Sequence, residues 1–453
     1  MTRVWLFVRS SYWFIPTVYG LLAITLAFLS HEMDQQIWRN PVFLEKIPTL
    51  FLADFDLAYT LLSTIATSIL TMTSISFSSI LVVMTTYVSQ FSPRSLQNFI
   101  TDHHTQRILG VFISGFVYSI VLLLLTKHSS ANGMDVLISP VFAVLIAIVS
   151  VGFFVFFVHH VAKWIQVRNL IQNIYNDTLN VMNRYWDDIE DEKEDDPWED
   201  WEGEETLEKH FQQIAAAQPG YVQWIHFQEL VEQSKKDDTL VELLYSHGDY
   251  LGKGMPIMRV YGNEGKIKKA KYNKYMIIGN ARESIQDVRY GIIKMVEIST
   301  RSLSPGINDP FTAIECINYL GHTLAALSRK TFMENYLHDR DGNLRVLKKV
   351  YTFHDYLYQS FFQIRFYGRD DVAVLNALLD ALHEISTHGK GAIQEDIWRF
   401  CRYIAEGIKQ ETFLDMDLDQ MQEKLDHLAV MTSAPKNNRI RLRQSNDRFN
   451  DHP

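Results

Sequence analysis

Hydroxyl side chains are dense between Leu57 and Pro93, a segment of 37 residues that contains no charged residue and no histidine. Fifteen of the 37 residues are Ser or Thr. Eight positions, spaced alternately by four and three residues, fall on one helix face with the 3.5-residue period of left-handed bundles: Thr60, Thr64, Thr67, Thr71, Ser74, Ser78, Leu81 and Thr85. We call these eight positions the hydroxyl stripe.

Three interpretations of the hydroxyl stripe are open. Small hydroxyl residues let helices approach closely and share hydrogen bonds, so a packing role needs no further assumption. The stripe could instead line a water-filled path for ions or small solutes, with Leu81 as a hydrophobic constriction that gates by dewetting. A segment this rich in hydroxyls also produces such a series by chance. The eight residues are therefore candidate pore-lining positions.

Two pairs of adjacent histidines, His103-His104 and His159-His160, are weak candidates for a metal site. Adjacent residues on a helix point about 100° apart, so each pair supplies one ligand easily and two only with difficulty. We expect solvated histidines near a membrane surface, and no metal and no cofactor.

The segment from Arg301 to Ala313 combines signals for the end of one helix and the start of another. Pro305 and Gly306 end the first helix, whereas Asp309 can cap the second, with Pro310 at its first position, where a missing N–H costs nothing. Four polar side chains could also converge here on a small ligand or a cation: Asp287, Arg301, Asn308 and Asp309. Capping and ion pairing are the stronger interpretation, because each of these residue types already has a local role.

No catalytic signature is present in the sequence. It contains no G-x-S-x-G, no H-E-x-x-H, no phosphate-binding loop of the Walker type and no strand-linked G-x-G-x-x-G. We therefore expect no enzyme and no catalytic residues. The net charge of -10 comes largely from one acidic run, so no nucleic-acid partner is expected either.

Four segments without Asp, Glu, Lys, Arg or His predict membrane-spanning helices: residues 10–30, 57–93, 108–126 and 136–158. A helix needs about 20 apolar residues to cross roughly 30 Å of hydrocarbon, and each segment is long enough or nearly so. Residues 1–160 hold only 14 charged side chains, whereas the remaining 293 residues hold 82. We expect residues 1–160 to form a four-helix transmembrane domain that is embedded in the lipid bilayer.

The second of these segments is too long for a simple span. Its 37 residues would make a straight helix of about 55 Å at 1.5 Å per residue. It must tilt, protrude or break. Pro93 is its predicted end, because the residue before a proline is pushed out of the helical region.

Lysine and arginine residues of the short loops predict the orientation of these helices. Six lie on one side and three on the other: Arg3, Arg9, Arg94, Arg107, Lys163 and Arg168, against Arg39, Lys46 and Lys127. This bias places both termini in the cytoplasm, and the acids of the loop 31–56 count little. The cysteines Cys316 and Cys401 fit a reducing compartment.

The region after the fourth helix is predicted to be a cytoplasmic α+β region, with a small β domain and then mostly helices. The last membrane helix should continue through residues 159–186, and the thirteen acids of residues 187–205 indicate a solvated linker, giving a segment 161–205. Strand-like patterns at 221–226, 239–245 and 257–261 indicate a β-rich domain over 206–280. Residues 281–432 are predicted to be mainly helical, and residues 433–453 to be a disordered basic tail.

Within the mainly helical region, apolar periodicity predicts six helices near residues 283–302, 310–329, 353–367, 370–387, 391–410 and 415–430. Between the second and third of them, residues 339–343 carry a turn signal flanked by two possible strands.

Three separated segments resemble the signature of a bacterial family of predicted membrane proteins, known as domain of unknown function 2254. The first runs from Phe77-Ser78 to Gln90-Phe91-Ser92-Pro93-Arg94, the second from Gly220 to Gly248-Asp249, and the third from Gln286-Asp287 to Ala313. The residues that carry the resemblance most directly are Gln90, Pro93, Arg94, Asp287, Arg301, Pro305, Gly306, Asn308, Asp309 and Pro310. The resemblance covers most of residues 1–390, and it implies a multi-pass protein of the bacterial cytoplasmic (inner) membrane.

The leading functional hypothesis is a homo-oligomeric channel or pore for ions or small solutes, lined by the hydroxyl stripe and gated or assembled by the cytoplasmic region. The alternative is a membrane-anchored sensor or scaffold, in which the bundle is a dry anchor and the cytoplasmic region binds a ligand or partner. An enzyme ranks third.

Overall fold

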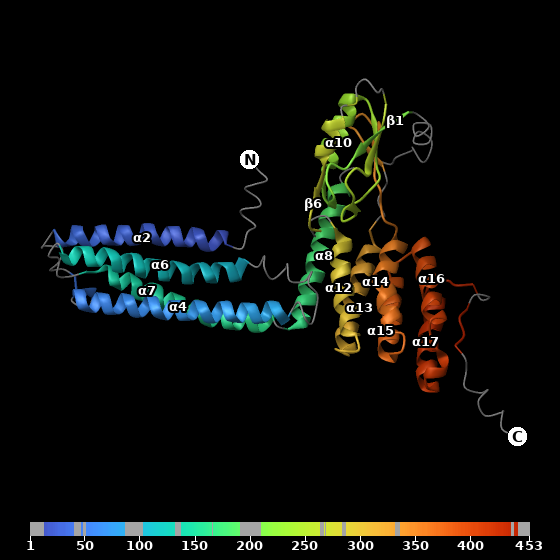
Figure 1. Cartoon of the computed structure of the whole chain (residues 1–453). Helices are drawn as coiled ribbons and strands as arrows, with labels where there is room; N and C mark the ends of the chain where they lie inside the picture. Colours follow the sequence, from blue (N-terminus) through green and yellow to red (C-terminus); the bar gives the residue numbers. More distant parts are fainter. Residues whose placement is uncertain are drawn as a thin grey trace. The chain divides into compact units, whose positions relative to one another are not determined.

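The computed structural model describes residues 13–39, 47–48, 51–86, 103–131, 137–164, 166–190, 210–262, 267, 269–282, 287–330, 336–435 and 439–442. The chain divides into two compact units, Met1–Asn169 and Leu170–Pro453, which we call the N-terminal and the C-terminal unit. The N-terminal unit contains apolar helices, and the C-terminal unit combines strands with further helices (Figure 1).

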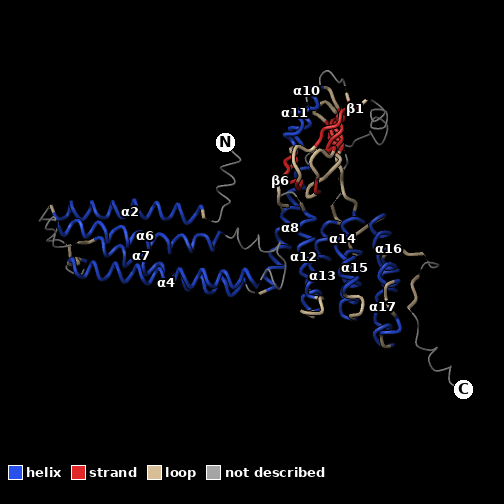
Figure 2. The backbone as a smooth tube through the Cα atoms, viewed as in Figure 1, coloured by secondary structure: helices blue, strands red, loops and turns tan. Residues whose placement is uncertain are grey.

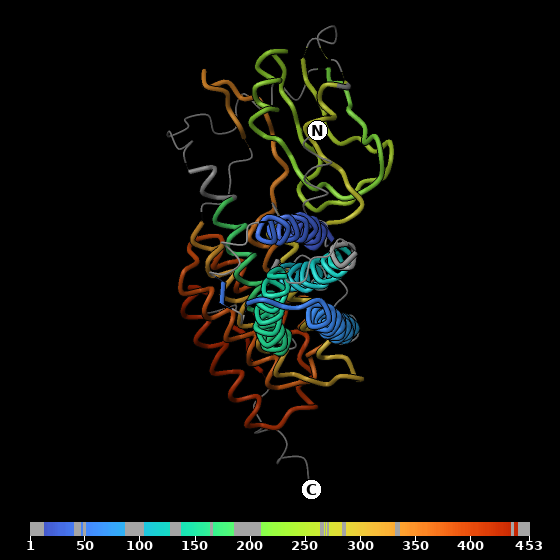
Figure 3. The backbone as a smooth tube through the Cα atoms, turned by 90° about the vertical axis from the view of Figure 1, so that its left-hand side faces the viewer, coloured from blue at the N-terminus to red at the C-terminus, as the bar shows by residue number. Residues whose placement is uncertain are grey.

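Four long helices make up most of the described part of the N-terminal unit: α2 (Phe14–Trp38), α4 (Phe55–Thr86), α6 (His103–Ala131) and α7 (Ser139–Trp164). Each is long and apolar enough to cross a membrane. Within the described residues, the prediction of four apolar helices is therefore confirmed. Seen nearly end on in Figure 3, the four helices form a bundle, in which α6 contacts each of the other three.

Alanine and leucine side chains, together with one tyrosine, fill the centre of this bundle. The buried cluster consists of Ala23, Ala27, Leu62, Tyr118, Leu122 and Ala143. Because lipid tails are as apolar as leucine, helices in a membrane associate through close van der Waals packing rather than through a hydrophobic driving force. Alanines at the contact allow that close approach.

Two predictions about the membrane helices are corrected. Helix α2 continues to Trp38, so His31, Glu32 and Asp34 lie in a helix and not in a loop. The fourth helix does not continue unbroken to residue 186, because α7 ends at Trp164 and a separate helix, α8 (Val167–Glu190), begins at Val167. The predicted helix end at Pro93 lies outside the described residues, as do Gln90 and Arg94.

Two sheets form the β part of the C-terminal unit (Figure 2). The larger has the order β1-β5-β3-β8-β7 and the smaller the order β4-β2-β6. The strands are β1 (Phe211–Ala215), β2 (Gly220–Ile225), β3 (Leu240–Leu243), β4 (Tyr250–Leu251), β5 (Pro256–Tyr261), β6 (Met276–Gly279), β7 (Tyr336–His338) and β8 (Leu344–Leu347). Helices α10 (Phe227–Asp237) and α11 (Lys269–Tyr272) belong to the same part.

Among the described strands, neighbouring strands pair antiparallel, except that β8 pairs parallel with β3, so that Val241 lies opposite Val346. Strands β7 and β8 form the hairpin that the turn signal at residues 339–343 predicts. They come from a segment far along the chain from β1 to β6. The sheet is thus completed by residues that follow the first two helices of the helical part.

The helical part consists of α12 (Val288–Ser302), α13 (Pro310–Leu327), α14 (Phe353–Tyr367), α15 (Val372–Ser386), α16 (Ala392–Glu406) and α17 (Asp415–Met431). The six predicted helices are confirmed. Helix starts follow from capping side chains: Asp287, Asp309, Thr352 and Asp371 each accept a hydrogen bond from a backbone N–H of the first turn. Cys316 and Cys401 are buried and form no disulfide.

Beyond α17, part of the predicted tail is described. The Leu442 N–H donates to Gln422 Oε1 at 2.8 Å, and the Gln422 side-chain amide donates to the Ile440 carbonyl at 3.1 Å. Leu442 is buried. Residues 439–442 therefore lie against α17.

Candidate functional site

Every position of the hydroxyl stripe lies on an exposed face of α4. Leu81, the only residue of the stripe without a hydroxyl, is 60% exposed. The buried face of the same helix carries Ala58, Leu62, Ala66, Ile69, Ser76, Ile80 and Val83. At about 100° per residue, these positions lie directly opposite the stripe. The hydroxyl stripe therefore points away from the other described helices of its own unit.

The hydroxyl groups of the stripe are hydrogen-bonded within α4 itself. Six of them donate to the carbonyl oxygen three or four residues earlier, at 2.7 to 3.0 Å: Thr64, Thr67, Thr71, Ser74, Ser78 and Thr85. A hydroxyl that donates its hydrogen in this way keeps its oxygen lone pairs as acceptors. The stripe therefore presents a row of hydrogen-bond acceptors to whatever covers it.

The two histidine pairs each contribute one ring to a contact between α6 and α7. The centroids of the His104 and His160 rings lie 5.7 Å apart, and the ring of Phe156 stacks on His160 at 5.9 Å. His159 is exposed, and the side chain of His103 is not among those described. Within the described parts of the chain, no three His, Cys, Asp or Glu residues are grouped so as to hold a metal.

The corner between α12 and α13 is built as the sequence predicts. Asp309 caps α13, its Oδ1 accepting the Thr312 N–H at 3.1 Å and its Oδ2 accepting the Thr312 hydroxyl at 2.6 Å. Asn308 adopts a left-handed conformation with φ of 50°. Pro310 occupies the first turn of α13, so the capping prediction is confirmed.

The ligand site that would unite Asp287 with this corner does not form. Asp287 caps the first turn of α12, whereas Arg301 lies in its last turn. The 15 residues of this helix separate the two ends by about 22 Å at 1.5 Å per residue. Asp287 therefore belongs to a different cluster from Asn308 and Asp309.

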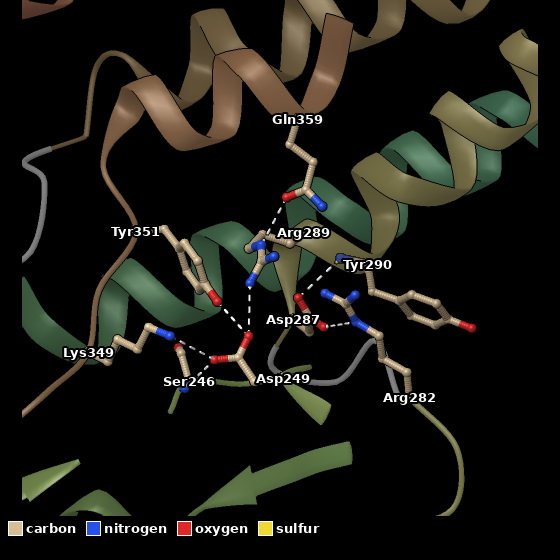
Figure 4. A network of polar contacts seen from close by, with 9 residues as sticks. All are labelled: Ser246, Asp249, Arg282, Asp287, Arg289, Tyr290, Lys349, Tyr351 and Gln359. Carbon is tan, nitrogen blue, oxygen red and sulfur yellow. Dashed lines mark hydrogen bonds and ion pairs between the residues drawn. The ribbon is translucent and has the colours of Figure 1, made fainter. Parts of the chain in front are cut away.

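That other cluster is a polar network around two carboxylates, shown in Figure 4. Asp287 is 4% exposed, and its Oδ2 accepts from Arg282 Nε at 2.5 Å while its Oδ1 accepts the Tyr290 N–H at 3.1 Å. Burial raises the pKa of Asp287 despite the neighbouring Arg282 and Arg289 guanidinium groups. Gly248 approaches this ion pair closely and has φ of 78°.

The second carboxylate, Asp249, joins the turn before β4 to the helical part. Its Oδ1 accepts from the Tyr351 hydroxyl at 2.5 Å and from Arg289 at 3.3 Å, and its Oδ2 accepts the Ser246 N–H at 3.0 Å. Burial opposes its ionisation, but these hydrogen bonds and the charges of Lys349 and Arg289 leave the pKa of Asp249 below its usual value.

Arg289 connects this network to α14. Its guanidinium lies over the Tyr351 ring, 3.7 Å from the centroid, and its Nε donates to Gln359 Oε1 at 2.9 Å (Figure 4). The network thus ties the β part to α12 and α14 through a few charged side chains. Because both carboxylates have partners, the arrangement suits a mechanical link between the two parts better than acid–base chemistry.

Only part of this network was predictable from the sequence. Gly248-Asp249 and Asp287 stand in the family-like segments, whereas Arg282, Arg289, Lys349 and Tyr351 were not among the candidates. No local spacing could have identified Arg289, Lys349 and Tyr351, because their partner Asp249 lies 40 or more residues away in the sequence, whereas Arg282 is only five residues from Asp287.

Helix α12, which carries part of the polar network, also makes a close contact with α8. A Cβ atom at Gly291 would lie 1.9 Å from Thr178 Oγ1, so only glycine permits the observed approach. One turn further on, Lys294 is 3% exposed and its ammonium lies 4.6 Å from the Tyr290 ring centroid. Burial lowers the pKa of Lys294 to about 8, and Asp177 and Asp287 offset only part of that effect.

Comparison with known proteins is consistent with this architecture. Uncharacterized proteins of Mycobacterium bovis and Mycobacterium tuberculosis are each 27% identical to this chain over 308 residues, or 66% of it. The match spans 58% of the length of each relative. No solved structure matches the chain.

The model of the family described as predicted membrane protein, domain of unknown function 2254, matches residues 9–384. This range includes the four candidate spans, both sheets and the polar network around Asp249 and Asp287. The chain therefore belongs to the family of predicted membrane proteins designated domain of unknown function 2254.

Proposed function

We propose that this protein is a homo-oligomeric channel for ions or small solutes in the bacterial inner membrane, with both termini in the cytoplasm. In this proposal, α4 helices from several copies turn their hydroxyl stripes toward a shared axis. The observation that carries it is the position of the stripe, opposite the buried face of α4. A role in packing the helices of one copy would place the stripe on the buried face.

The outward face of α7 differs from the hydroxyl stripe of α4. The exposed residues in the middle of α7 include Leu145, Ile148, Val149, Val151 and Val155, and all are apolar. Such a surface is compatible with lipid, whereas a hydroxyl at nearly every turn of α4 suits water or a second copy of the helix. The 32 residues of α4 would make a helix of about 48 Å, longer than the hydrocarbon layer.

The chemistry of the stripe favours cations among the possible solutes. Its hydroxyl hydrogens are used by the α4 backbone, so the outward groups are oxygen lone pairs. Oxygen acceptors replace part of the hydration shell of a cation and offer nothing comparable to an anion. Leu81, near one end of the stripe, would form the apolar constriction.

The C-terminal unit would assemble or gate this channel. Its polar network is suited to transmit strain, because Asp249 and Asp287 connect the β part with α12 and α14. We assign no catalytic step to it.

A membrane-anchored sensor or scaffold is the second candidate function. It is favoured by the exposed apolar side chains at the corner between α12 and α13, where Phe311 is 78% and Ile307 41% exposed. A partner that covers this corner would remove both from water. In that case the bundle would be a dry anchor.

Two pairs of matched substitutions separate the candidates. Leu81→Ser and Ser74→Asp alter the hydroxyl stripe, whereas Val155→Ser and Ile148→Asp place the same side chains on α7, where Val155 is 65% and Ile148 63% exposed. The measurement is cation flux into liposomes that contain the purified full-length protein, together with the yield of folded protein.

In a channel, Leu81→Ser raises the flux and Val155→Ser leaves it unchanged. Ser74→Asp is tolerated at a wet surface and changes cation conductance, whereas Ile148→Asp in lipid costs about 3 kcal/mol of insertion free energy and lowers the yield. A pore along α4 would be excluded if no variant passed cations and if Ser74→Asp and Ile148→Asp lowered the yield of folded protein equally.

A further inference from the structure

A cluster of polar side chains is buried near the C-terminal end of α2, where the sequence indicates only loop residues. Asp34 is 2% exposed and His31 is 5% exposed, and they lie three residues apart on one helix face. Ionisable residues buried in a membrane bundle are costly and usually serve a function. Neither residue takes part in the hydroxyl stripe of α4.

Asp34 caps a different helix from its own. Its Oδ1 accepts hydrogen bonds from the Ile138 N–H at 2.9 Å and the Ser139 N–H at 3.0 Å, at the start of α7. The first N–H groups of a helix have no partner within that helix, so this carboxylate satisfies donors that would otherwise be unpaired in the bundle. The contact fixes the end of α2 to the beginning of α7.

Tyr118 closes the cluster from α6. Its hydroxyl lies 3.0 Å from Ser30 Oγ and 3.2 Å from the Ser139 carbonyl oxygen, and the Tyr118 side chain is fully buried. Three helices therefore meet at this point, and each contributes a polar group. The site is preorganised by contacts that do not involve the second oxygen of Asp34.

Three polar atoms of the cluster remain unsatisfied. Asp34 Oδ2, His31 Nδ1 and Ser139 Oγ are buried and have no hydrogen-bond partner within the described ranges. Gln35 Nε2 lies 3.0 Å from His31 Nε2. Because an amide nitrogen only donates, His31 Nε2 accepts this hydrogen bond, and the hydrogen of the neutral ring resides on the unpaired Nδ1. The cluster thus holds an unpaired carboxylate oxygen, an unpaired ring N–H and an unpaired hydroxyl.

A proton is the ligand that fits these groups. An ionised carboxylate buried with one oxygen uncompensated is unfavourable, whereas a proton on Oδ2 removes the charge and leaves Oδ1 able to accept both N–H groups. The cluster offers one carboxylate and one imidazole, and the described parts of the chain hold no group of three metal-binding side chains.

The surroundings of Asp34 leave few other groups to interact with its charge. His31 on α2 and Tyr118 on α6 are the titratable neighbours, and α7 contributes two backbone N–H groups and the Ser139 hydroxyl. Other charged residues described at this end of the bundle are exposed: Glu32, Arg39, Asp54 and Asp56.

We propose that Asp34, beside His31, is a proton-binding site whose occupancy controls the attachment of α7 to α2. The proton binds at Oδ2 and is released from the same atom. Hydrogen bonds to a charged carboxylate are roughly twice as strong as those to a neutral one, so proton uptake loosens the first turn of α7 and release tightens it. This site is independent of any pore along α4.

Infrared spectroscopy of the full-length protein in lipid nanodiscs tests the binding step. A protonated buried carboxyl gives a C=O stretching band, which should appear and disappear with pH and should shift when the protein is labelled with 13C at the aspartate carboxyl carbon. Asp34→Asn should abolish the band. Asp54→Asn is the matched control, because Asp54 caps α4 by accepting the Leu57 N–H at 2.8 Å but is exposed.

Hydrogen exchange tests the consequence for α7. When the band appears, protection of the Ile138 and Ser139 amides should fall roughly tenfold relative to the Leu57 amide in the same sample, which corrects for the intrinsic pH dependence of exchange. If Asp34→Asn does not fold, Asp34→Glu keeps a carboxyl at the site and decides the assignment: with 13C-labelled aspartate the titrating band should no longer shift in Asp34→Glu, whereas in Asp54→Asn it should still shift.

Two results would overturn the proposal. One is the absence of a titrating, 13C-sensitive band over the whole pH range in which the protein stays folded. The other is a change in the α7 amides that follows sodium concentration at constant pH, which would identify a cation rather than a proton as the ligand.

Discussion

Gly248→Ala is the sharpest test of the polar network in the C-terminal unit. Gly248 has φ of 78°, and an added Cβ would lie 2.0 Å from Asp287 Oδ2 and 2.5 Å from Arg282 Nε. The first distance is far below the 3.4 Å at which ordinary contact begins. The substitution must therefore both strain the backbone and displace the buried ion pair.

The two costs can be separated with a second glycine. Gly254 has φ of 82°, and its added Cβ would meet nothing within 4 Å, so Gly254→Ala measures the backbone term alone. That term is roughly 1–2 kcal/mol for a left-handed alanine. Breaking a buried ion pair costs about 3–5 kcal/mol when one partner is left uncompensated, although the loop can relax part of this. We expect Gly248→Ala to destabilise the unit by about 3 kcal/mol more than Gly254→Ala.

Native-state hydrogen exchange of the full-length protein measures this difference. The informative amide is Tyr290 N–H, which donates to Asp287 Oδ1 at the start of α12. A difference of about 3 kcal/mol corresponds to a protection factor roughly a hundredfold lower in Gly248→Ala than in Gly254→Ala. Equal protection in the two variants would show that the Arg282–Asp287 pair does not hold the β part to α12, and the interpretation of the network as a link would be wrong.

Two further predictions concern α12. Gly291→Ala should destabilise the protein by about 1–3 kcal/mol, because the added Cβ would overlap Thr178 of α8. Adding Thr178→Ala should restore part of this loss, as measured by thermal unfolding. If the two substitutions change the unfolding free energy independently, the contact would be refuted. The second prediction concerns Lys294, whose pKa is lowered from 10.5 to about 8. Between these two pH values, Lys294 is protonated in the unfolded chain but not in the folded chain. Stability should therefore rise by up to about 3 kcal/mol as pH increases through this window, and Lys294→Met should unfold with no such pH dependence.

The features that local chemistry dictates were predictable from the sequence. Charge-free segments identify the four spans, because hydrocarbon excludes charges over the length of a helix. Asp309 and Pro310 mark the start of α13, since a cap acts within one turn. The regular spacing of the hydroxyl stripe also places it on one face of α4.

The direction of that face could not be deduced in the same way. The stripe by itself is compatible with the interior of a bundle or with its exterior, and only the packing of Ala58, Leu62 and Ala66 against other helices decides between them. Likewise, Arg289 and Asp249 are 40 residues apart, and no spacing rule connects them. The sequence places Asp34 in a loop, because its partners are backbone N–H groups of another helix, and such partners cannot be identified from residue types or spacing.

The parallel pairing of β8 with β3 constrains how the chain can fold during synthesis. Val346 of β8 is fully buried in the same core as Val241 and Ile257, yet it leaves the ribosome about a hundred residues after Val241. Until then β3 has one open edge, and an open edge invites pairing with another chain. Helices α12 and α13 emerge in the meantime and can fold on local contacts. The nascent protein therefore carries an incomplete sheet through a large part of its translation, and this stage is where a chaperone would be needed most.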